Sequence, residues 1–454
     1  MNEAGTVEPV RLECGDASPR SKAILLFVSL TTCLQILASD VQHRLANPDP
    51  FPVVNSKKGL QVQMLDDALA LGIKHAALNV NLSQFVALTN GPGTVAWDVD
   101  GTQCFLRGDV ARGLDRQVKT LSDAGVVVSL ILLSYAPADT EIKRIMLHPE
   151  CSSKAPNHLG AFNTVTPEGV RHLRACVEFI SERYSRPGYP HGRAVNFIVG
   201  NEVNSHWFWY NMGRAPMERV AEAYEKAVRI CHDAVRRFSA CGRVYVSLEH
   251  HWNIRYPGGD ALQAFPGKPF LDHFARLARQ NGDFEWHVAL HPYPENLFDC
   301  RTWNDKSALP NPDTPRVTFK NLEVLSKYLR QPELLFNGKP RRIILSEQGF
   351  HSNDSPDGET LQAAAYAYAW YRVANLPEID SFILHRHVDH GAEGGLNLGL
   401  WRRKPGSISE PDTRKKIYDV FLRADKADWR AAFAFALPVI GIERWEDLLP
   451  ANGE

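Results

Sequence analysis

The stretch from residue 167 to 203, PEGVRHLRACVEFISERYSRPGYPHGRAVNFIVGNEV, decides the fold. Its first part, 167–184, spaces its apolar residues as a helix with one buried face does. Its second part, 194–203, is a nearly continuous apolar run, which is typical of a strand buried on both faces in a parallel sheet. A helix that leads into such a strand is the building unit of an α/β protein.

The same alternation runs through most of the chain. Further helices are predicted at 60–71, 110–124, 216–238, 268–280, 318–329, 358–374 and 412–422. The other strands are predicted at 75–80, 126–133, 243–250, 284–293, 341–350 and 381–388. Seven strands are thus visible, and we expect an eighth before Lys57 or within 95–106. No glycine-rich phosphate fingerprint follows any strand, so the prediction is a (β/α)8 TIM barrel with extended loops at its C-terminal face and not a doubly wound sheet.

Length and composition agree with one large barrel. The chain has 454 residues, of which 44% are hydrophobic and 23% charged, which excludes a disordered or collagen-like protein. With 51 basic and 52 acidic residues the net charge is −1, so no overall field attracts nucleic acid. We predict a leader at 1–50, a catalytic barrel at 51–425 and a C-terminal extension at 426–454 that packs on the barrel.

The leader contains the apolar run AILLFVSLTTCLQILA at 23–38, preceded by Arg20 and Lys22. It resembles the core of a signal peptide and is short for a stable membrane span, and the alternative is a short structural segment. The expected location is therefore secreted or periplasmic. Eight cysteines show no CxxC spacing, which disfavours zinc or thiol redox chemistry, although their even number allows a disulfide.

Two glutamates stand where predicted strands end. In a parallel barrel the chemistry lies on the loops that follow the strands. The fourth strand continues into GNEVN, with Asn201 and Glu202, and the seventh into SEQGF, with Glu347. A buried carboxylate without a partner is costly, so each must either pair with an arginine in the barrel mouth or serve a function. Two such glutamates together favour function, and two carboxylates facing each other across a cleft are what glycoside hydrolysis requires.

These residues, with the His-x-Tyr of the sixth strand, resemble the retaining (β/α)8 glycoside hydrolases of clan A. The segments SKKGLQ at 56–61 and ALNVNLSQ at 77–84 are also similar to a bacterial family within that superfamily. The resemblance implies five roles. Glu202 would be the general acid/base, Asn201 would bind the sugar 2-hydroxyl, Glu347 would be the nucleophile, Tyr293 its hydrogen-bond partner, and His291 would line the same wall.

The chain departs from the clan at the end of the eighth strand. The clan commonly has tryptophan there, whereas this sequence has His385 and Arg386, which changes the expected substrate more than the chemistry. Arg386, with arginines elsewhere near the mouth, would suit a carboxylate or sulfate on the sugar or would neutralise carboxylates of the wall. The other arginines in question are Arg255, Arg402 and Arg403.

Aromatic and polar side chains after the strands are candidates for substrate binding, because a flat indole offers contact area to the apolar face of a sugar. The tryptophans predicted in loops after strands are Trp97, Trp207, Trp209, Trp252, Trp303 and Trp401. The full set of candidate substrate-binding residues is Asn201, His291, Tyr293, Trp207, Trp209, His250, Trp252, His385, Arg386 and Asn79.

A second hypothesis comes from histidines in the same loops. His385-x-His387, with Asp389 and His390, has the spacing of metal ligands, as in a metal-dependent amidohydrolase. Such barrels usually set their His-x-His pair on the first strand, whereas the early strands here offer Asn79 and Asn81. A third reading is a barrel that binds carbohydrate without cleaving it, which the paired glutamates disfavour. The prediction is an enzyme without metal or other cofactor, acting on a carbohydrate, with no nucleic-acid partner, as a monomer or small homo-oligomer.

Overall fold

The computed structural model describes residues 45–449. The predicted leader up to residue 44, including the signal-like run at 23–38, lies outside the described residues, as do residues 450–454. No helix in the described part is long and apolar enough to cross a membrane.

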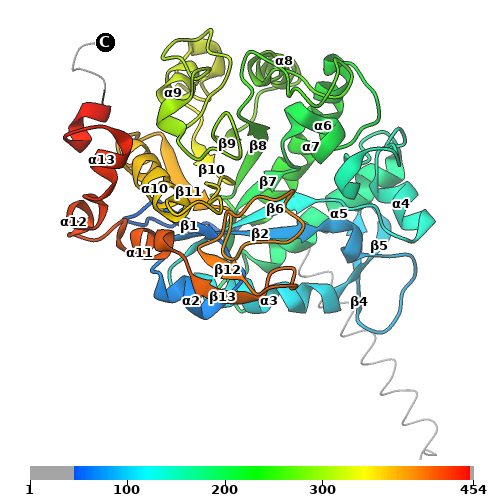
Figure 1. Ribbon diagram of the computed structural model, residues 1–454. Helices are drawn as coiled ribbons and strands as arrows, with labels where there is room; N and C mark the ends of the chain where they lie inside the picture. Colours follow the sequence, from blue (N-terminus) through cyan, green and yellow to red (C-terminus); the bar gives the residue numbers. More distant parts are fainter. Residues whose placement is uncertain (1–44, 450–454) are drawn as a thin grey trace, which may run out of the picture. The chain divides into compact units, whose positions relative to one another are not determined.

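The centre of the structure is a closed barrel of eight parallel strands, with helices around it (Figure 1). In order around the barrel the strands are β1 (Lys58–Gln61), β2 (His75–Asn81), β6 (Val127–Leu133), β7 (Ala194–Val199), β8 (Arg243–Glu249), β9 (Trp286–His291), β10 (Ile343–Leu345) and β11 (Ile379–Leu384). The pairing of Gly59 with Ile383 on one side and with His75 on the other closes the ring. The predicted TIM barrel is confirmed.

The eighth strand was placed wrongly by the sequence. It is β1, which begins at Lys58, so it lies neither before Lys57 nor within 95–106. The latter segment forms β4 (Thr94–Val99) and β5 (Thr102–Arg107), which pair antiparallel in a separate three-stranded sheet with β3 (Val86–Ala87). A Cβ atom at Gly59 would lie 2.8 Å from the Ile383 side chain, so β1 packs too closely against its neighbour for a larger residue.

Helices surround the barrel. They are α2 (Leu65–Ala70), α3 (Gly108–Asp123), α4 (Thr140–Met146), α5 (Pro167–Arg183), α6 (His206–Trp209), α7 (Met217–Phe238), α8 (Gly267–Gln280), α9 (Glu323–Tyr328) and α10 (Gly358–Ala374). The one-turn α6 lies in the loop after β7, with Trp209 packed on the inner layer of the barrel. Short 3-10 turns are Leu82–Phe85, Pro156–His158, Val203–Ser205, Thr302–Asn304, Pro332–Leu334 and Trp445–Leu448. The predictions at 60–71 and 318–329 were too long, because the first overlaps β1 and only residues 323–328 of the second form a regular helix.

The chain after the barrel forms small elements. The segment 412–422 contains the end of β13 (Pro411–Arg414), which pairs with β12 (Trp401–Arg403), and most of α11 (Lys416–Arg423), where one helix was predicted. Beyond it lie α12 (Trp429–Phe433) and α13 (Ala436–Ile440). The rings of Trp429 and Trp445 pack on Tyr371 of α10.

Inward-facing side chains fill the barrel, as expected for a packed core. The cluster at its centre comprises Ala77, Ile131, Leu133, Leu159, Ile198, Tyr245, Ala289, Ile344 and Ile383. The six cysteines among the described residues are all free, and Cys104, Cys176, Cys231 and Cys300 are buried. The centre of the barrel is therefore mainly apolar, and buried polar side chains on its strands, such as Asn196 and Ser129, are hydrogen-bonded to each other.

Candidate active site

The structure brings Glu202 and Glu347 together at the C-terminal face of the barrel. Glu202 follows β7 and Glu347 follows β10. One carboxylate oxygen of each and a ring nitrogen of His291, at the end of β9, all lie within 4.8 Å of one another. Glu202 is 8% exposed and Glu347 is half-buried, so both carboxyl groups are largely removed from water.

The local backbone explains how Glu202 reaches this position. Gly200 has φ 72° and Glu202 has φ 41°, so the chain turns sharply through left-handed conformations directly after β7. A Cβ atom at Gly200 would lie 2.6 Å from the Tyr210 ring, so only glycine fits there. A left-handed non-glycine residue costs about 1–2 kcal/mol, which the surrounding contacts must offset. One of them is the hydrogen bond from the Glu202 backbone N–H to Ser247 Oγ on β8, at 3.0 Å.

Glu249, at the end of β8, holds the turn that follows Glu202. Its Oε1 accepts hydrogen bonds from Asn204 Nδ2 at 2.6 Å and Ser205 Oγ at 3.0 Å. Its Oε2 accepts from the His251 backbone N–H at 2.8 Å and lies 2.5 Å from His251 Nδ1. Burial acts to raise the pKa of Glu249, but the His251 hydrogen bond and charge outweigh it and lower the pKa to about 2. Sequence reasoning missed this role, although Glu249 also closes an apolar run.

His291 connects the two strand ends that carry the glutamates. Its Nδ1 lies 2.9 Å from Glu202 Oε1, and its Nε2 lies 3.0 Å from Ser346 Oγ, next to Glu347. Burial raises the pKa of Glu202; the bond to His291 opposes this, while the charges of Glu347 and Glu249 add to it. Glu202 therefore keeps its proton to a higher pH than an ordinary glutamate does.

Glu347 has the opposite tendency. Tyr293 Oη donates to its Oε1 at 3.3 Å, and Gln61 Nε2 of β1 donates to its Oε2 at 3.2 Å. Burial acts to raise the pKa of Glu347, but the positive charges of His385 and His291 and the Gln61 hydrogen bond outweigh it and lower the pKa. The environments thus push the pKa values of the two carboxyl groups apart, which is the usual sign of an acid and a base with separate roles.

Other predicted polar residues surround this pair. The half-buried side chain of Asn201 makes no hydrogen bond to any residue in the described part of the chain, so its amide is available to a ligand. Asn79 is exposed on β2 and lines a cavity of about 410 Å³ together with Gln61 and Arg386. His385 Nδ1 lies 2.6 Å from Gln61 Oε1.

The predicted aromatic rim is only partly present. Trp207 and Trp209 lie half-buried in α6, directly after the Glu202 turn, and Trp209 packs on the inner layer of the barrel. Trp252, in contrast, is 1% exposed and packs edge-on against Tyr328, so its assignment as a substrate-binding ring was wrong. His250 is also buried, and burial lowers its pKa to about 3.

Other tryptophans of the set serve the protein itself. Trp97 was predicted in a loop but lies buried in β4, where its indole N–H donates to Glu178 at 3.0 Å. The indole N–H of Trp401 donates to Asp67 at 3.0 Å. Trp303 packs on Tyr368.

Replacing Trp252 by alanine should therefore act on stability. Removing a fully buried indole leaves a cavity and should lower the free energy of unfolding by about 3–5 kcal/mol. Denaturant unfolding would measure this loss. Trp207→Ala is the matched control, because its half-buried ring is expected to contribute much less. Equal stability of the Trp252→Ala variant and the unaltered protein would contradict the packing described here.

Two exposed tyrosines at the mouth were missed, because the predicted stacking rings were tryptophans. Tyr135, after β6, is 38% exposed, and Tyr256, after β8, is 36% exposed. Burial and then the charge of Glu347 raise the pKa of Tyr135, whereas burial and then the charges of Glu202 and Glu249 raise that of Tyr256. Each carboxylate thus has an accessible ring near it, which suits contact with the apolar face of a sugar.

The histidine motif of the metal hypothesis does not form a joint ligand set. His385 Nε2 lies 3.2 Å from Glu393 Oε1, and His387 Nε2 lies 2.9 Å from Asp67 Oδ2. Asp389 Oδ1 pairs with Lys415 Nζ at 3.0 Å. His385 and His390 face Glu393, whereas His387 and Asp389 pair with other residues. The four residues do not form one ligand set, so the reading of His385-x-His387 as a metal site was wrong.

Two other groups of side chains lie close enough to share an ion. One consists of Glu202, His291 and Glu347, and the other of Glu249, His250 and His251. In the second group the oxygens of Glu249 already accept hydrogen bonds from three neighbouring residues. The first group is the carboxylate pair itself.

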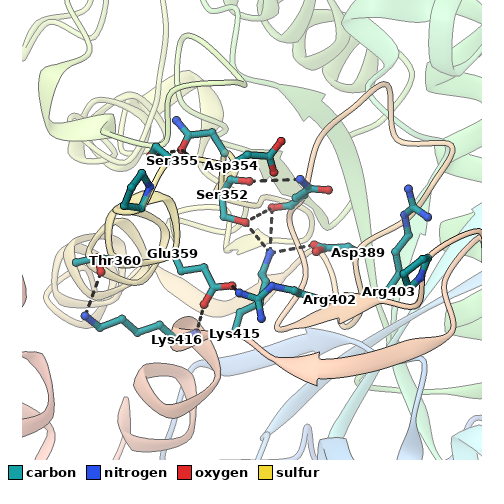
Figure 2. Close-up of a pocket in the computed structure, with 14 residues that line it drawn as sticks. Ser352, Asp354, Ser355, Glu359, Thr360, Asp389, Arg402, Arg403, Lys415 and Lys416 are labelled. Carbon is teal, nitrogen blue, oxygen red and sulfur yellow. Dashed lines mark hydrogen bonds and ion pairs between the residues drawn. The ribbon is translucent and has the colours of Figure 1, made fainter.

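A separate hollow of about 680 Å³ lies between the loop before α10, the β11–β12 loop and the start of α11 (Figure 2). The buried Lys415 points into the loops and donates to Asp389 Oδ1, Ser352 Oγ and the Asn397 carbonyl. Arg402 pairs with Glu359 at the rim. Two ion pairs, Arg402 with Glu359 and Lys415 with Asp389, lie in this hollow, and neither Glu202 nor Glu347 lines it. We therefore place the active site at Glu202 and Glu347.

The arginines considered for an acidic sugar also face protein groups. Arg386 pairs with Glu393 and Arg402 with Glu359. Arg403 donates to the Ser407 carbonyl, and Arg255 donates to the Gly259 carbonyl. These contacts favour the reading in which the arginines neutralise or fix the wall.

Comparison with known proteins places the chain in a family. The profile of a family described as "Family of unknown function (DUF5722)" matches residues 50–448, so the chain belongs to this family. Among curated proteins, none matches the sequence significantly.

Solved structures share the barrel. A family 39 glycoside hydrolase from Bacteroides cellulosilyticus WH2 is 12% identical, with a TM-score of 0.52, over 80% of this chain and 60% of that one. A hyperthermophilic beta-glucosidase from Pyrococcus furiosus is 14% identical, with a TM-score of 0.52, over 83% of this chain and 86% of that one. This chain thus spans about 60% of the length of the family 39 enzyme. The matches show that this chain shares its barrel fold with these two enzymes.

Proposed function

We propose that this member of the DUF5722 family is a glycoside hydrolase that cleaves O-glycosidic bonds of an oligo- or polysaccharide with retention of configuration. One observation carries the proposal: oxygens of Glu202 and Glu347 lie within 4.8 Å of each other, in environments that push their pKa values apart. Retaining glycosidases place their two carboxyl groups about 5–5.5 Å apart, whereas inverting ones leave about 6.5–9.5 Å for a water.

The chemistry assigned to these residues has two displacements. Glu347 attacks the anomeric carbon while the bond to the leaving oxygen breaks, and Glu202 donates its proton to that oxygen. Glu202, now ionised, then takes a proton from a water that attacks the glycosyl-enzyme, and Glu347 leaves as a carboxylate. The free amide of Asn201 would bind the 2-hydroxyl, and His291 would hold Glu202 toward the leaving group.

The rate of hydrolysis should show a bell-shaped dependence on pH. The reaction needs Glu347 ionised, so activity rises as pH increases through its pKa, which its cationic neighbours lower. The reaction also needs Glu202 protonated, so activity falls as pH increases through its pKa, which burial raises. The acidic limb of kcat/KM should therefore lie below, and the alkaline limb above, the ordinary glutamate pKa of about 4.3. Initial rates on an activated aryl glycoside from pH 3 to 9, about the range over which these limbs can be resolved, would measure both.

The decisive experiment is a screen with stereochemical readout. Aryl glycosides of common sugars and a polysaccharide panel would be scored for released phenol and new reducing ends, and proton NMR would identify the first anomer formed. A product of retained configuration supports the proposal, and an inverted first product contradicts it.

The screen also addresses the two alternatives. Activity that chelation abolishes and a divalent metal restores would favour the metal-dependent hydrolase. Carbohydrate binding without any new reducing end would favour the non-catalytic barrel.

A further inference from the structure

We propose that Glu393, on the loop between β11 and β12, is a positioning residue that holds His385 as an imidazolium cation, and that this cation keeps Glu347 ionised through Gln61. The inference rests on the proposed role of Glu347 as nucleophile. It concerns the end of the eighth barrel strand, where this chain has histidine in place of the tryptophan common in clan A.

A continuous chain of hydrogen bonds connects the four residues. Glu347 Oε2 accepts from the Gln61 amide nitrogen at 3.2 Å. If the Gln61 amide were flipped, its oxygen would face the carboxylate oxygen of Glu347, and two acceptors would be in contact. The amide oxygen must therefore face His385, whose Nδ1 lies 2.6 Å away. His385 Nδ1 therefore carries a hydrogen. On the other side of the ring, Nε2 lies 3.2 Å from Glu393 Oε1.

Both ring nitrogens of His385 thus face acceptors. An imidazole that donates from both nitrogens is the cation, because the neutral ring has one donor and one acceptor. Glu393 is the acceptor on the outer side, since the charges and hydrogen bonds of His385 and Arg386 outweigh its burial and lower its pKa to about 2. Arg386 pairs with the second oxygen of Glu393, and His390 Nδ1 lies 4.0 Å from that oxygen. The ionisable groups facing His385 are thus Glu347 and Glu393, with Arg386 and His390 as further cations.

The loop that carries Glu393 is fixed at both ends. Buried Lys415 donates to Asp389 Oδ1 at 3.0 Å (Figure 2). It also donates to the Asn397 carbonyl at 3.2 Å. Asp389 Oδ1 also accepts from the Gly399 backbone N–H at 2.7 Å. These bonds close the segment 389–399 on itself. Its conformation therefore holds the Glu393 carboxylate beside His385 without a ligand.

The charges predict the sign of the effect. The negative charge of Glu393 acts directly to raise the pKa of Glu347, whereas the positive charge of His385 lowers it and is the larger influence. Without Glu393, burial and the Arg386 guanidinium would both disfavour the imidazolium. Loss of Glu393 should then raise the pKa of Glu347 if Glu393 acts through His385, and lower it if Glu393 acts only directly.

The first test uses nitrogen-15 histidine NMR on the full chain without substrate. His385→Gln would identify the His385 signals, and spectra would follow pH in the unaltered protein and in Glu393→Gln. At one common pH we expect both His385 ring nitrogens to give imidazolium signals in the unaltered protein, because both face acceptors, and the ring to give the signals of the neutral form in the variant. A His385 that is neutral at that pH in the unaltered protein, or unchanged in the variant, would overturn the proposal.

The second test follows Glu347 in protein labelled with carbon-13 at the glutamate carboxyl groups, with Glu347→Gln for identification. In Glu393→Gln the titration of Glu347 should move upward by about one pH unit. A downward move, or none, would mean that Glu393 does not act through His385. Asp354→Asn is the matched control, because this exposed residue on the neighbouring loop before α10 loses the same charge and should move neither titration.

Neither titration requires a substrate, so a failed search for a glycoside would count against the proposed function and leave this inference to be decided by NMR. If an aryl glycoside is hydrolysed, the acidic limb of kcat/KM should move upward in Glu393→Gln and not in Asp354→Asn. A merely structural role for Glu393 would lower the melting temperature or the rate without moving that limb.

Discussion

Replacing Glu347 by alanine should abolish hydrolysis, with kcat reduced by about 10³-fold or more, because no other carboxylate can form the glycosyl-enzyme. Azide should restore part of the activity. The shortened side chain leaves space for a small anion on the face from which Glu347 attacks, and Glu202 can still protonate the leaving group. The product should be a glycosyl azide of inverted configuration, because only one displacement occurs. Product NMR and rates with and without azide would measure both effects.

The control for this variant must separate chemistry from folding. Glu359→Ala removes a carboxylate that pairs with Arg402 at the separate hollow, and it should keep full activity. A Glu347→Ala protein that melts like the unaltered one and still hydrolyses substrate would exclude Glu347 as nucleophile. Loss of activity with azide rescue that retains configuration would mean that Glu347 is the acid/base and that another carboxylate is the nucleophile.

The barrel could be predicted because its strands are buried on both faces. Runs such as residues 126–133 must be apolar in any parallel barrel, and they stand out between amphipathic helices. The strand β1 did not stand out, because it has only four residues and a short helix follows it closely. The helical spacing of apolar residues in that helix extends back to residue 60, inside the strand. The tight packing of Gly59, which places β1 between β11 and β2, depends on Ile383, over 300 residues away in the sequence, as well as on His75.

The candidate site was predicted where the chemistry is local to a strand end. Glu202, Glu347, His291 and Tyr293 each close an apolar run, and the structure brings them together. Trp252 also follows a strand, but tertiary packing buries its ring, and a sequence does not reveal which loop residues turn inward. Glu393 could not be found, because it lies within the loop between β11 and β12 and not at a strand end. It meets His385 only because contacts of Lys415 fix the fold of that loop.

Glu202→Ala should distinguish substrates by their leaving groups. Glu202 is needed to protonate an alkoxide that leaves poorly, so hydrolysis of natural glycosides should fall by about 10²–10⁴-fold. An acidic phenol leaves an aryl glycoside without being protonated, so the first displacement should continue. The glycosyl-enzyme should then accumulate, which a burst of released phenol would show. The water that hydrolyses the glycosyl-enzyme also loses its general base. Azide, which needs no base, should therefore accelerate turnover and give a glycosyl azide of retained configuration, the opposite of that expected for Glu347→Ala.

The pH profile provides an independent sign of the same role. The alkaline limb of kcat/KM reports the proton of Glu202, whose pKa burial raises, and it should disappear in Glu202→Ala while the acidic limb of Glu347 remains. His291→Asn is the matched control, because it removes the 2.9 Å contact with Glu202 and keeps the carboxyl group. It should move the alkaline limb without abolishing it. An equal loss of rate for good and poor leaving groups in Glu202→Ala would mean that Glu202 binds substrate and that another group supplies the proton.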